Sequence, residues 1–236
     1  METYVDKWNE SYSRYENFIF YPKDEYVKFL NRFVRKRIGI DKFVDILDFD
    51  GGGRALDYGC GLGRLTILMK EFGLDAYGVD ISGNAIANAK ALANHLKYPD
   101  MEDRFVTIDG KKLPFPDNYF QVTISESVLD SMHYELAKII MEEIDRVTNS
   151  LAFIRLISGD DSEHYREYAG EEVVQTEHER DTIQSYFNMQ KIRGLISSTG
   201  FKIKWCRLIT EESTIDRYKY GRYYILLKKE TISVGK

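Results

Sequence analysis

Acidic residues and closely spaced glycines mark the part of this chain that could hold a ligand. Asp57 ends a short apolar run and is followed by glycines at every second position, Gly59, Gly61 and Gly63. Glycine lacks a Cβ, so such a turn can reach positive φ and a ligand can lie against bare backbone. Asp80 ends a second apolar run, seventeen residues after Gly63. A carboxylate there can accept two hydrogen bonds from a ribose diol.

The segments around these residues alternate between short apolar runs and stretches with apolar residues at helical spacing. This alternation favours a parallel α/β fold, whose strands end at one edge of the sheet. Ser82 is suited to cap the helix after the second strand. The predicted strands cover 55–58, 76–80, 104–108, 120–125 and 151–157, the predicted helices cover 64–70, 85–96, 135–147 and 189–198, and 201–209 with 223–228 form a closing hairpin.

The glycine spacing differs from the two common phosphate-binding patterns. The dinucleotide fingerprint reads G-x-G-x-x-G, and here Arg64 occupies the sixth position. The phosphate loop is also missing, because no G-K-[ST] follows the glycines. A nicotinamide-dependent oxidoreductase is therefore disfavoured, and a glycine turn in some other α/β protein stays open as an alternative.

The stretch Ala55–Gly63 resembles motif I of the class I S-adenosylmethionine (SAM)-dependent methyltransferases. Leu113–Ser125 is similar to the LPF-x-D-x-x-F-D-x-V stretch of the small-molecule members, with Gln121 in place of the usual second acid. The resemblance runs from Arg54 to about Asp130. It implies a Rossmann-like, seven-stranded, mostly parallel sheet of strand order 3-2-1-4-5-7-6, with helices on both faces.

The resemblance also implies how SAM, the one cofactor expected, would be held. Asp80 would bind the ribose, although an acid that simply ends a strand is the alternative interpretation. Asp109 would accept a hydrogen bond from the adenine amino group. No Cys/His cluster has zinc spacing, and no metal ligand is predicted. The implied cofactor-binding residues are Asp57, Gly59, Gly61, Gly63, Asp80, Ile81, Asp109, Gly110 and Ser125.

The loop after the fourth strand should face the reacting methyl group, because ligands bind outside the carboxyl ends of the strands in open α/β sheets. This loop has neither the VLHH nor the N/D-P-P-[YFW] sequence of other members. The absence of the N/D-P-P-[YFW] sequence argues against methylation of a nucleobase or a glutamine amide. The candidates for a catalytic base are Glu126, Asp130 and His133. His133 could equally begin the following helix.

Residues 1–50 are rich in aromatic side chains and helical in pattern, with one helix predicted over 26–37. They form either a helical layer on the sheet or, as the resemblance implies, a lid over the SAM pocket. Residues 51–236 would then be the methyltransferase domain. Within it, the acidic segment 159–187 is either a substrate-side insert or a solvated loop. The predicted substrate-binding residues are Tyr12, Tyr15, Tyr21 and His164.

The composition of the chain narrows the range of possible binding partners. The chain has 236 residues, 43% of them hydrophobic, which is enough for one large domain with a substantial core. A net charge of −5 argues against a general nucleic-acid surface. There is no long apolar run and no signal-like start, so we expect a cytoplasmic protein that does not enter a membrane. Cys60 and Cys206 are expected to be free thiols. The oligomeric state is left open.

The sequence therefore predicts methyl transfer from SAM to an oxygen or nitrogen of a small polar acceptor. The run Tyr12-x-x-Tyr15-Glu16-x-Phe18 resembles methyltransferases encoded with surface-polysaccharide enzymes, which implies a sugar or glycan precursor. Two alternatives remain: a protein methyltransferase, and a SAM-binding regulatory subunit without turnover.

Overall fold

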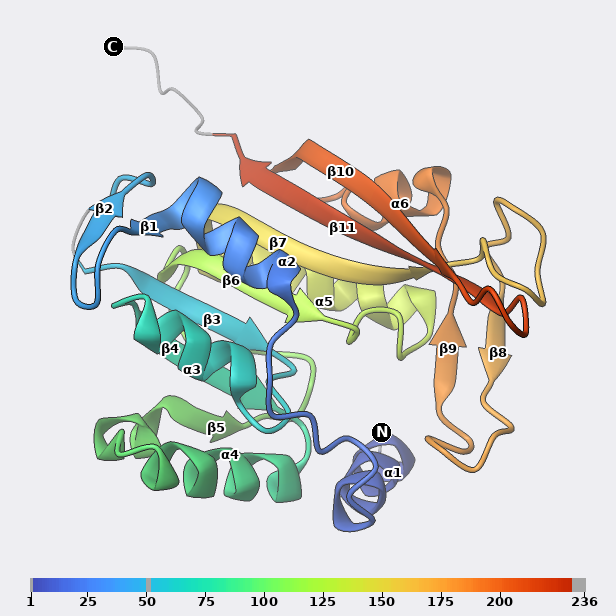
Figure 1. The fold of residues 1–236 in the computed structure, drawn as a ribbon, viewed down its shortest axis with the longest axis horizontal. Helices are drawn as coiled ribbons and strands as arrows, with labels where there is room; N and C mark the ends of the chain where they lie inside the picture. Colours follow the sequence, from blue (N-terminus) through green and yellow to red (C-terminus); the bar gives the residue numbers. More distant parts are fainter. Residues whose placement is uncertain (1, 50–51, 231–236) are drawn as a thin grey trace.

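The computed structural model describes residues 2–49 and 52–230 and is built around one seven-stranded sheet (Figure 1). Five neighbouring strands are parallel. The strand β11 is antiparallel to both of its neighbours, β7 and β10. From one edge to the other, the strands are β5 (Phe105–Thr107), β4 (Asp75–Asp80), β3 (Arg54–Tyr58), β6 (Phe120–Glu126), β7 (Thr148–Ser158), β11 (Lys219–Lys229) and β10 (Phe201–Glu212).

Counted along the chain, this sheet places its strands in the order 3-2-1-4-5-7-6, which is the predicted order. Helical crossovers between parallel strands return the chain to the same starting edge. All five carboxyl ends of β3 to β7 therefore meet at one edge, where the loops after each strand come together. The fold class predicted from the sequence is confirmed.

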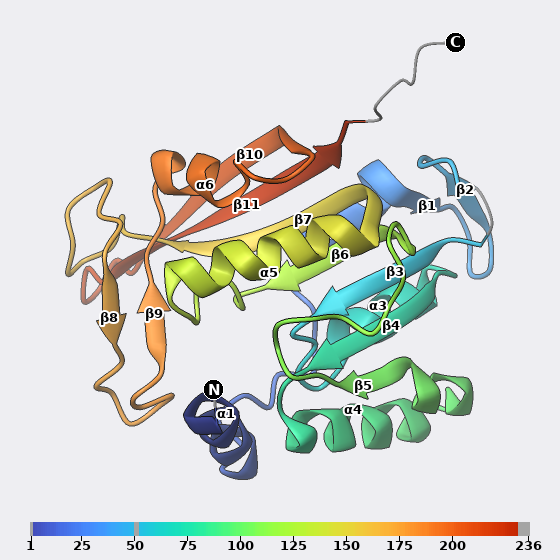
Figure 2. The ribbon, with the colours of Figure 1, turned by 180° about the vertical axis from the view of Figure 1, so that it is seen from behind.

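Helices cover both faces of the sheet (Figure 2). One face packs against α2 (Asp24–Phe29), α3 (Arg64–Glu71) and α4 (Gly83–His95), and the other against α5 (Tyr134–Val147) and α6 (Met189–Leu195). On the first face Phe29 of α2 stacks on Phe153 of β7 with ring centroids 4.3 Å apart. Burying side chains of this size stabilises the fold by about 1.5–3 kcal/mol each. A 3-10 helix, Pro99–Arg104, leads into β5.

The helix predicted over 26–37 is confirmed as far as Val34 and is wrong only for its last three residues, 35–37. After α2 the chain forms a π-helix, Leu30–Val34, and then β1 (Arg35–Arg37), which pairs antiparallel with β2 (Phe43–Asp45). The Arg35 side chain pairs with Asp45 across this small hairpin and donates a hydrogen bond to the Gly73 carbonyl at 2.6 Å. These long-range partners override the local preference for a helix.

The N-terminal segment and the 159–187 segment meet at the carboxyl edge of the sheet (Figure 1). The helix α1 (Glu2–Ser13) lies there, away from α2. Residues 159–187 contain a short antiparallel hairpin of β8 (Glu171–Val173) and β9 (Ile183–Ser185). Lys7 Nζ of α1 donates to the Asp181 carbonyl at 2.7 Å, so α1 contacts the loop that joins β8 to β9.

The thiols of Cys60 and Cys206 are free, as predicted. Across residues 2–49 and 52–230, none of the helices combines the length and the apolar character needed to cross a membrane.

Candidate active site

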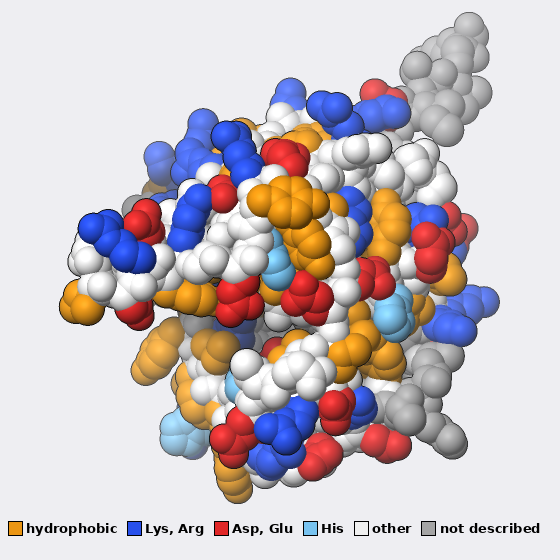
Figure 3. Space-filling model, turned by 90° about the vertical axis from the view of Figure 1, so that its right-hand side faces the viewer, with side chains coloured by type: hydrophobic (Ala, Val, Ile, Leu, Met, Phe, Trp, Pro, Cys, Tyr) orange, Lys and Arg blue, Asp and Glu red, His pale blue; other side chains and the backbone are white. Residues whose placement is uncertain are grey.

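A cavity of about 430 Å³ lies at the carboxyl ends of the parallel strands. Its walls come from the loops after β3, β4, β5 and β6, from β7 and β11, and from α1 and the β8–β9 hairpin. Figure 3 views the molecule from this side, where acidic side chains are grouped around a central hollow. A cavity of this size at the edge where strand ends meet is the expected place for a small ligand.

The glycine turn after β3 forms one wall of this cavity. Gly59, Gly61 and Gly63 all have positive φ, at 74°, 53° and 79°. Gly59 and Gly61 line the cavity, as predicted for residues that approach a ligand. A Cβ on Gly61 would lie 2.5 Å from the Tyr12 hydroxyl of α1, so α1 covers this bare backbone directly. The turn therefore needs glycine at 61 both for its φ and for the close approach of α1.

Gly63, the third predicted glycine of the turn, makes a packing contact. It does not line the cavity, and it immediately precedes α3 in the left-handed conformation. A Cβ on Gly63 would lie 2.7 Å from the Phe105 ring of β5. Gly63 thus allows close packing between the helix start and the sheet rather than contact with a ligand.

Two buried acids line the cavity next to the glycine turn. Asp80, at the end of β4, is 7% exposed, and its two oxygens accept from the backbone N–H groups of Gly61 and Ser82, each at 2.9 Å. Asp57, at 1% exposed, accepts from the backbone and hydroxyl of Thr66 at 3.0 and 2.8 Å. Burial raises the pKa of both carboxyls, that of Asp57 to about 7. Both therefore favour a positively charged ligand that would offset the cost of burying the charge.

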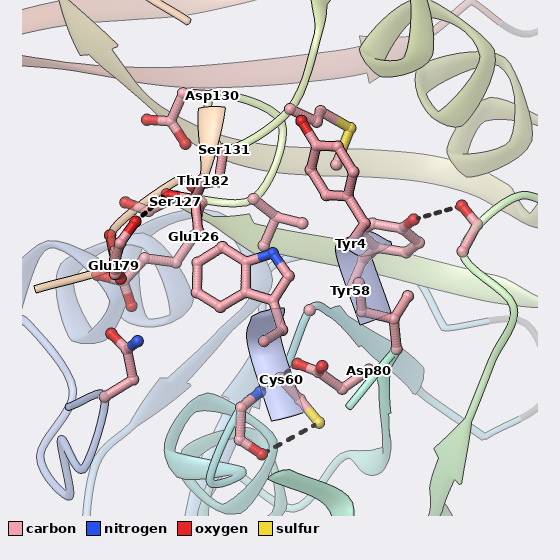
Figure 4. Close-up of a pocket in the computed structure, with 18 of the residues that line it drawn as sticks. Tyr4, Tyr58, Cys60, Asp80, Glu126, Ser127, Asp130, Ser131, Glu179 and Thr182 are labelled. Atoms are coloured by element: carbon pink, nitrogen blue, oxygen red, sulfur yellow. Dashed lines mark hydrogen bonds between the residues drawn. The ribbon is translucent and has the colours of Figure 1, made fainter. Parts of the chain in front are cut away.

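The loop after β5 supplies a third acid and an apolar contact. Asp109 and Gly110 line the cavity, together with Ile81 from the end of β4. Asp109 is exposed and accepts from the backbone N–H groups of Lys111 and Lys112, which lowers the pKa of its carboxyl. The Tyr58 hydroxyl donates to the Gly110 carbonyl at 3.1 Å and fixes the loop (Figure 4).

The loop after β6 brings two more acids to the opposite side of the cavity (Figure 4). Glu126 pairs with Arg64 at 2.5 Å and lies 3.8 Å from the Arg155 guanidinium. Asp130 is 4% exposed; its Oδ2 accepts from the Ile157 N–H at 2.6 Å, and its Oδ1 has no hydrogen-bond partner in the described chain. Burial raises the pKa of Asp130. Asp130 thus has an unused oxygen at the wall of the cavity.

Several predicted site residues do not line the cavity. His133 points to β8, where its Nδ1 lies 2.8 Å from Glu171, and His164 lies between the rings of Tyr168 and Tyr186. Ser125 is buried within β6. Tyr15 and Tyr21 lie on the surface, 71% and 84% exposed. The predicted residues outside the cavity wall are Gly63, Ser125, His133, Tyr15, Tyr21 and His164.

Of the three predicted tyrosines, Tyr12 alone lines the cavity. Its helix is fixed at the start of α4, where Asn9 Oδ1 accepts from the Ser82 hydroxyl at 2.8 Å and the Asn9 carbonyl accepts from Asn84 Nδ2 at 3.0 Å. Tyr4, also from α1, lines the cavity, and its hydroxyl is buried without a hydrogen-bond partner among the described residues. Burial raises the pKa of Tyr4 to about 12, so this hydroxyl stays protonated and can donate a hydrogen bond.

Five cationic residues also line the cavity, and no motif in the sequence predicts a role for them. One sign was available for Arg155, a lone charge in the otherwise apolar run 151–157, because buried strands rarely carry an unpaired charge. For Arg64, the sequence pattern indicates only that this residue breaks the dinucleotide fingerprint. The five residues are Lys23, Arg64, Lys111, Arg155 and Arg222.

Together, the strand order, the glycine turn after the first strand of the sheet and the acids after the next two define the class I SAM-dependent methyltransferase fold. The sequence profile of a family described as a methyltransferase domain matches residues 56–156 of this chain. SAM is the cofactor that defines this class of domain.

The relatives agree with this assignment. Phosphoethanolamine N-methyltransferase 3 of Arabidopsis thaliana is 38% identical over 89 residues, which make up 37% of this chain and 18% of that protein. The chain thus matches less than a fifth of that relative's length. A SAM-dependent methyltransferase structure from Methanosarcina mazei superposes with a TM-score of 0.62 at 19% identity, over 77% of this chain and 94% of that one.

A third comparison is with magnesium protoporphyrin IX methyltransferase of Synechocystis, determined with bound SAM. It gives a TM-score of 0.53 at 20% identity, over 76% of this chain and 71% of that one. At these identities the solved structures establish a shared fold.

The cavity of this chain fits a nucleoside that carries a sulfonium. Asp80 and Asp109 offer carboxylate oxygens at adjacent strand ends, suited to hydroxyl and amino groups. Ile81 offers an apolar contact beside them. Asp57 is a buried carboxyl beside the glycine turn, and a cation there would favour its ionised form. The residues present therefore suit this cofactor.

The packing role of Gly63 can be tested by Gly63→Ala. The new methyl meets Phe105 and the residue is strained at positive φ, so the free energy of unfolding should fall by about 1–3 kcal/mol. Urea denaturation measures this change. Gly83→Ala is the matched control, because a Cβ there has nothing within 4 Å. Equal stability of the two variants would contradict the packing role.

Proposed function

We propose that this protein is a SAM-dependent methyltransferase that acts on an oxygen or nitrogen of a small polar acceptor. The observation that carries the proposal is Asp80. Its buried carboxylate holds the Gly61 N–H at the cavity wall, beside Asp57 and close to the loop that carries Asp109. This arrangement suits the ribose, the amino acid part and the adenine of one ligand.

Bound SAM supplies an activated methyl group on a positively charged sulfur. The chain would contribute mainly by positioning the two ligands and excluding water. The acids would hold the cofactor at one end of the cavity, and the cover would restrict the entry of water. We assign this cover to α1 together with the β8–β9 hairpin, within the predicted lid 1–50 and the predicted insert 159–187. Two contacts support a joint cover: Lys7 to the Asp181 carbonyl at 2.7 Å, and the Glu179 N–H to Glu16 at 3.3 Å.

Asp130 is the favoured proton acceptor, with Glu126 second. Glu126 forms ion pairs through both oxygens, Oε2 with Arg64 at 2.5 Å and Oε1 with Arg155 at 3.8 Å, although Oε1 has no hydrogen bond among the described residues. Asp130 Oδ1 has neither a hydrogen bond nor an ion pair in the described chain, and Asp130 lines the cavity. Burial raises the pKa of Asp130, which makes its ionised form a stronger base. His133 is set aside because its ring faces Glu171 outside the cavity.

The cavity favours a small acceptor over a protein chain, because α1 and the β8–β9 hairpin contribute to its walls. A small alcohol or amine fits this setting, and a sugar or glycan precursor stays within that class. One relative is named phosphoethanolamine N-methyltransferase 3, and that name supports a small polar acceptor.

The central test is SAM binding by wild type and Asp80→Ala. The variant loses two charge-assisted backbone contacts and the proposed ribose contact, so we expect affinity to fall by about a hundredfold or more in calorimetry. Asp75→Ala, at the other end of β4, is the control and should bind normally. Circular dichroism checks that both fold. Unchanged affinity of Asp80→Ala would contradict the proposal. Formation of S-adenosylhomocysteine with candidate acceptors then separates an enzyme from a binding subunit.

The Asp57 carboxyl predicts how SAM affinity depends on pH. Its pKa is raised to about 7 by burial, so it is mostly protonated below that pH. A cation favours the ionised form, so a proton must leave when SAM binds at lower pH. Affinity should rise as the pH increases through about 7, by at most about tenfold per unit. Calorimetry in buffers of different ionisation enthalpy should detect proton release. Asp57→Asn should remove that release, and an identical profile for the variant would refute this role.

Asp130→Asn tests the proton acceptor. An amide cannot take the proton from the acceptor, so kcat should fall by about a hundredfold or more. Affinity for S-adenosylhomocysteine should change by less than about twofold, because the residue lies away from Asp80 (Figure 4). Asp103→Asn, at an exposed position, is the control. A variant with wild-type kcat would exclude Asp130 as the base.

A further inference from the structure

Three cationic side chains stand between the main cavity and a smaller neighbouring one of about 270 Å³. Lys23, Arg155 and Arg222 line both cavities. They come from distant parts of the chain: Lys23 directly precedes α2, Arg155 lies in β7 and Arg222 lies in β11. Strand pairing brings the two arginines together, because Tyr224 pairs with Arg155 and Arg222 is two residues from Tyr224, on the same face.

These cations are poorly balanced by the acids around them. Within the described chain, Lys23 and Arg222 form no ion pair. Arg222 donates only to the neighbouring Gly221 carbonyl, at 2.8 Å. Arg155 is 8% exposed, and its Nε has no hydrogen-bond partner among the described residues. Its other contacts are with Ser127 and, at 3.8 Å, with Glu126.

Both signs of charge are present around these cations. Lys23, Arg64, Arg155 and Arg222 line the main cavity at this end together with the acids Glu126 and Asp130. The smaller cavity adds Asp24, Glu25 and Glu211, none of which forms an ion pair with Lys23 or Arg222 in the part of the chain that the structure describes. Glu126 is already engaged by Arg64 at 2.5 Å. Partial burial lowers the pKa of Lys23 and of Arg222, and repulsion from Arg155 acts in the same direction. An anion at this end would relieve both effects.

SAM as a whole cannot serve as that anion. The amino acid part of SAM is a zwitterion whose charges cancel, and the sulfonium adds one positive charge. Binding SAM therefore brings no net negative charge to Lys23, Arg155 and Arg222. The second molecule that the proposed reaction requires enters the same cavity and can bring it.

We infer that the acceptor carries an oxyanion group, a phosphate or a carboxylate, which Lys23, Arg155 and Arg222 hold. This inference rests on the proposed function and names the chemical class of its substrate. Guanidinium groups bind both kinds of oxyanion through paired N–H donors, and a lysine adds a point charge. Asp130 lines the same region and would face the other end of the acceptor.

The test uses Arg222→Gln, with Arg207→Gln on the adjacent strand β10 as the matched control, because Arg207 is exposed and lines neither cavity. Inorganic phosphate is titrated into the protein with and without saturating S-adenosylhomocysteine. We expect phosphate to bind wild type and the control, and to bind Arg222→Gln about tenfold more weakly. Lys23→Gln is a second variant with the same expectation, should Arg222→Gln fail to fold.

Turnover gives an independent readout. Paired acceptors are compared, each as a phosphorylated, a carboxylated and a neutral form of the same alcohol or amine. We expect an anionic form to be preferred by wild type, and its KM to rise by about tenfold in Arg222→Gln with the neutral form unaffected. Preference for the phosphorylated or the carboxylated form identifies which oxyanion the site takes.

Two results would overturn the inference. One is phosphate binding that is absent, or equal in Arg222→Gln and the control. The other is a tenfold or greater loss of S-adenosylhomocysteine affinity in Arg222→Gln, because the cation would then serve the carboxylate of the cofactor. Failure of wild type to bind S-adenosylhomocysteine would instead defeat the proposed function, and the titration without that ligand would still test the anion site.

Discussion

The site depends on how one buried carboxylate is paired. Asp80 ends β4, and its two oxygens accept from the Gly61 N–H of the glycine turn and from the Ser82 N–H before α4, each at 2.9 Å. A carboxylate at 7% exposure would be strongly destabilising without such donors. The pair of bonds joins three segments, the turn after β3, the end of β4 and the start of α4, so the floor of the cavity is held as one unit.

The cover of the cavity is attached to the same unit. Asn9 of α1 accepts from the Ser82 hydroxyl, and Tyr12 of α1 lies over Gly61. The β8–β9 hairpin then contacts α1 through Lys7 and the Asp181 carbonyl. A change in the Asp80 loop should therefore reach the cover as well, because cover and floor share Ser82 and Gly61. This linkage is a physical reason to expect ligand binding and cover position to be coupled.

Charge divides the cavity into two ends with different chemistry. Asp57 and Asp80 lie beside the glycine turn, where they favour a cation. Lys23, Arg155 and Arg222 lie on the side of β7 and β11, where they favour an anion. A cationic cofactor and an anionic acceptor would thus be bound at separate ends, with their reacting groups directed toward each other. Positioning of this kind is the main means of catalysis when the leaving group is already activated.

The sequence by itself determined the order and type of the seven strands of the central sheet and of α3, α4, α5 and α6, and it brought Asp80 to the glycine-turn end of the cavity. Those depend on local periodicity, on the glycine spacing and on the rule that parallel strands end at one edge, which places Asp80 beside the turn after β3. Only the tertiary structure decided which residues line the other end of the cavity, beside β7 and β11. Arg155 and Arg222 meet because β11 pairs with β7, and that pairing joins residues far apart in the chain. The same holds for His133, whose ring turns to Glu171 of β8 because α5 and the hairpin pack together. Contacts of this kind leave no local pattern, since they are set by which surfaces finally bury one another.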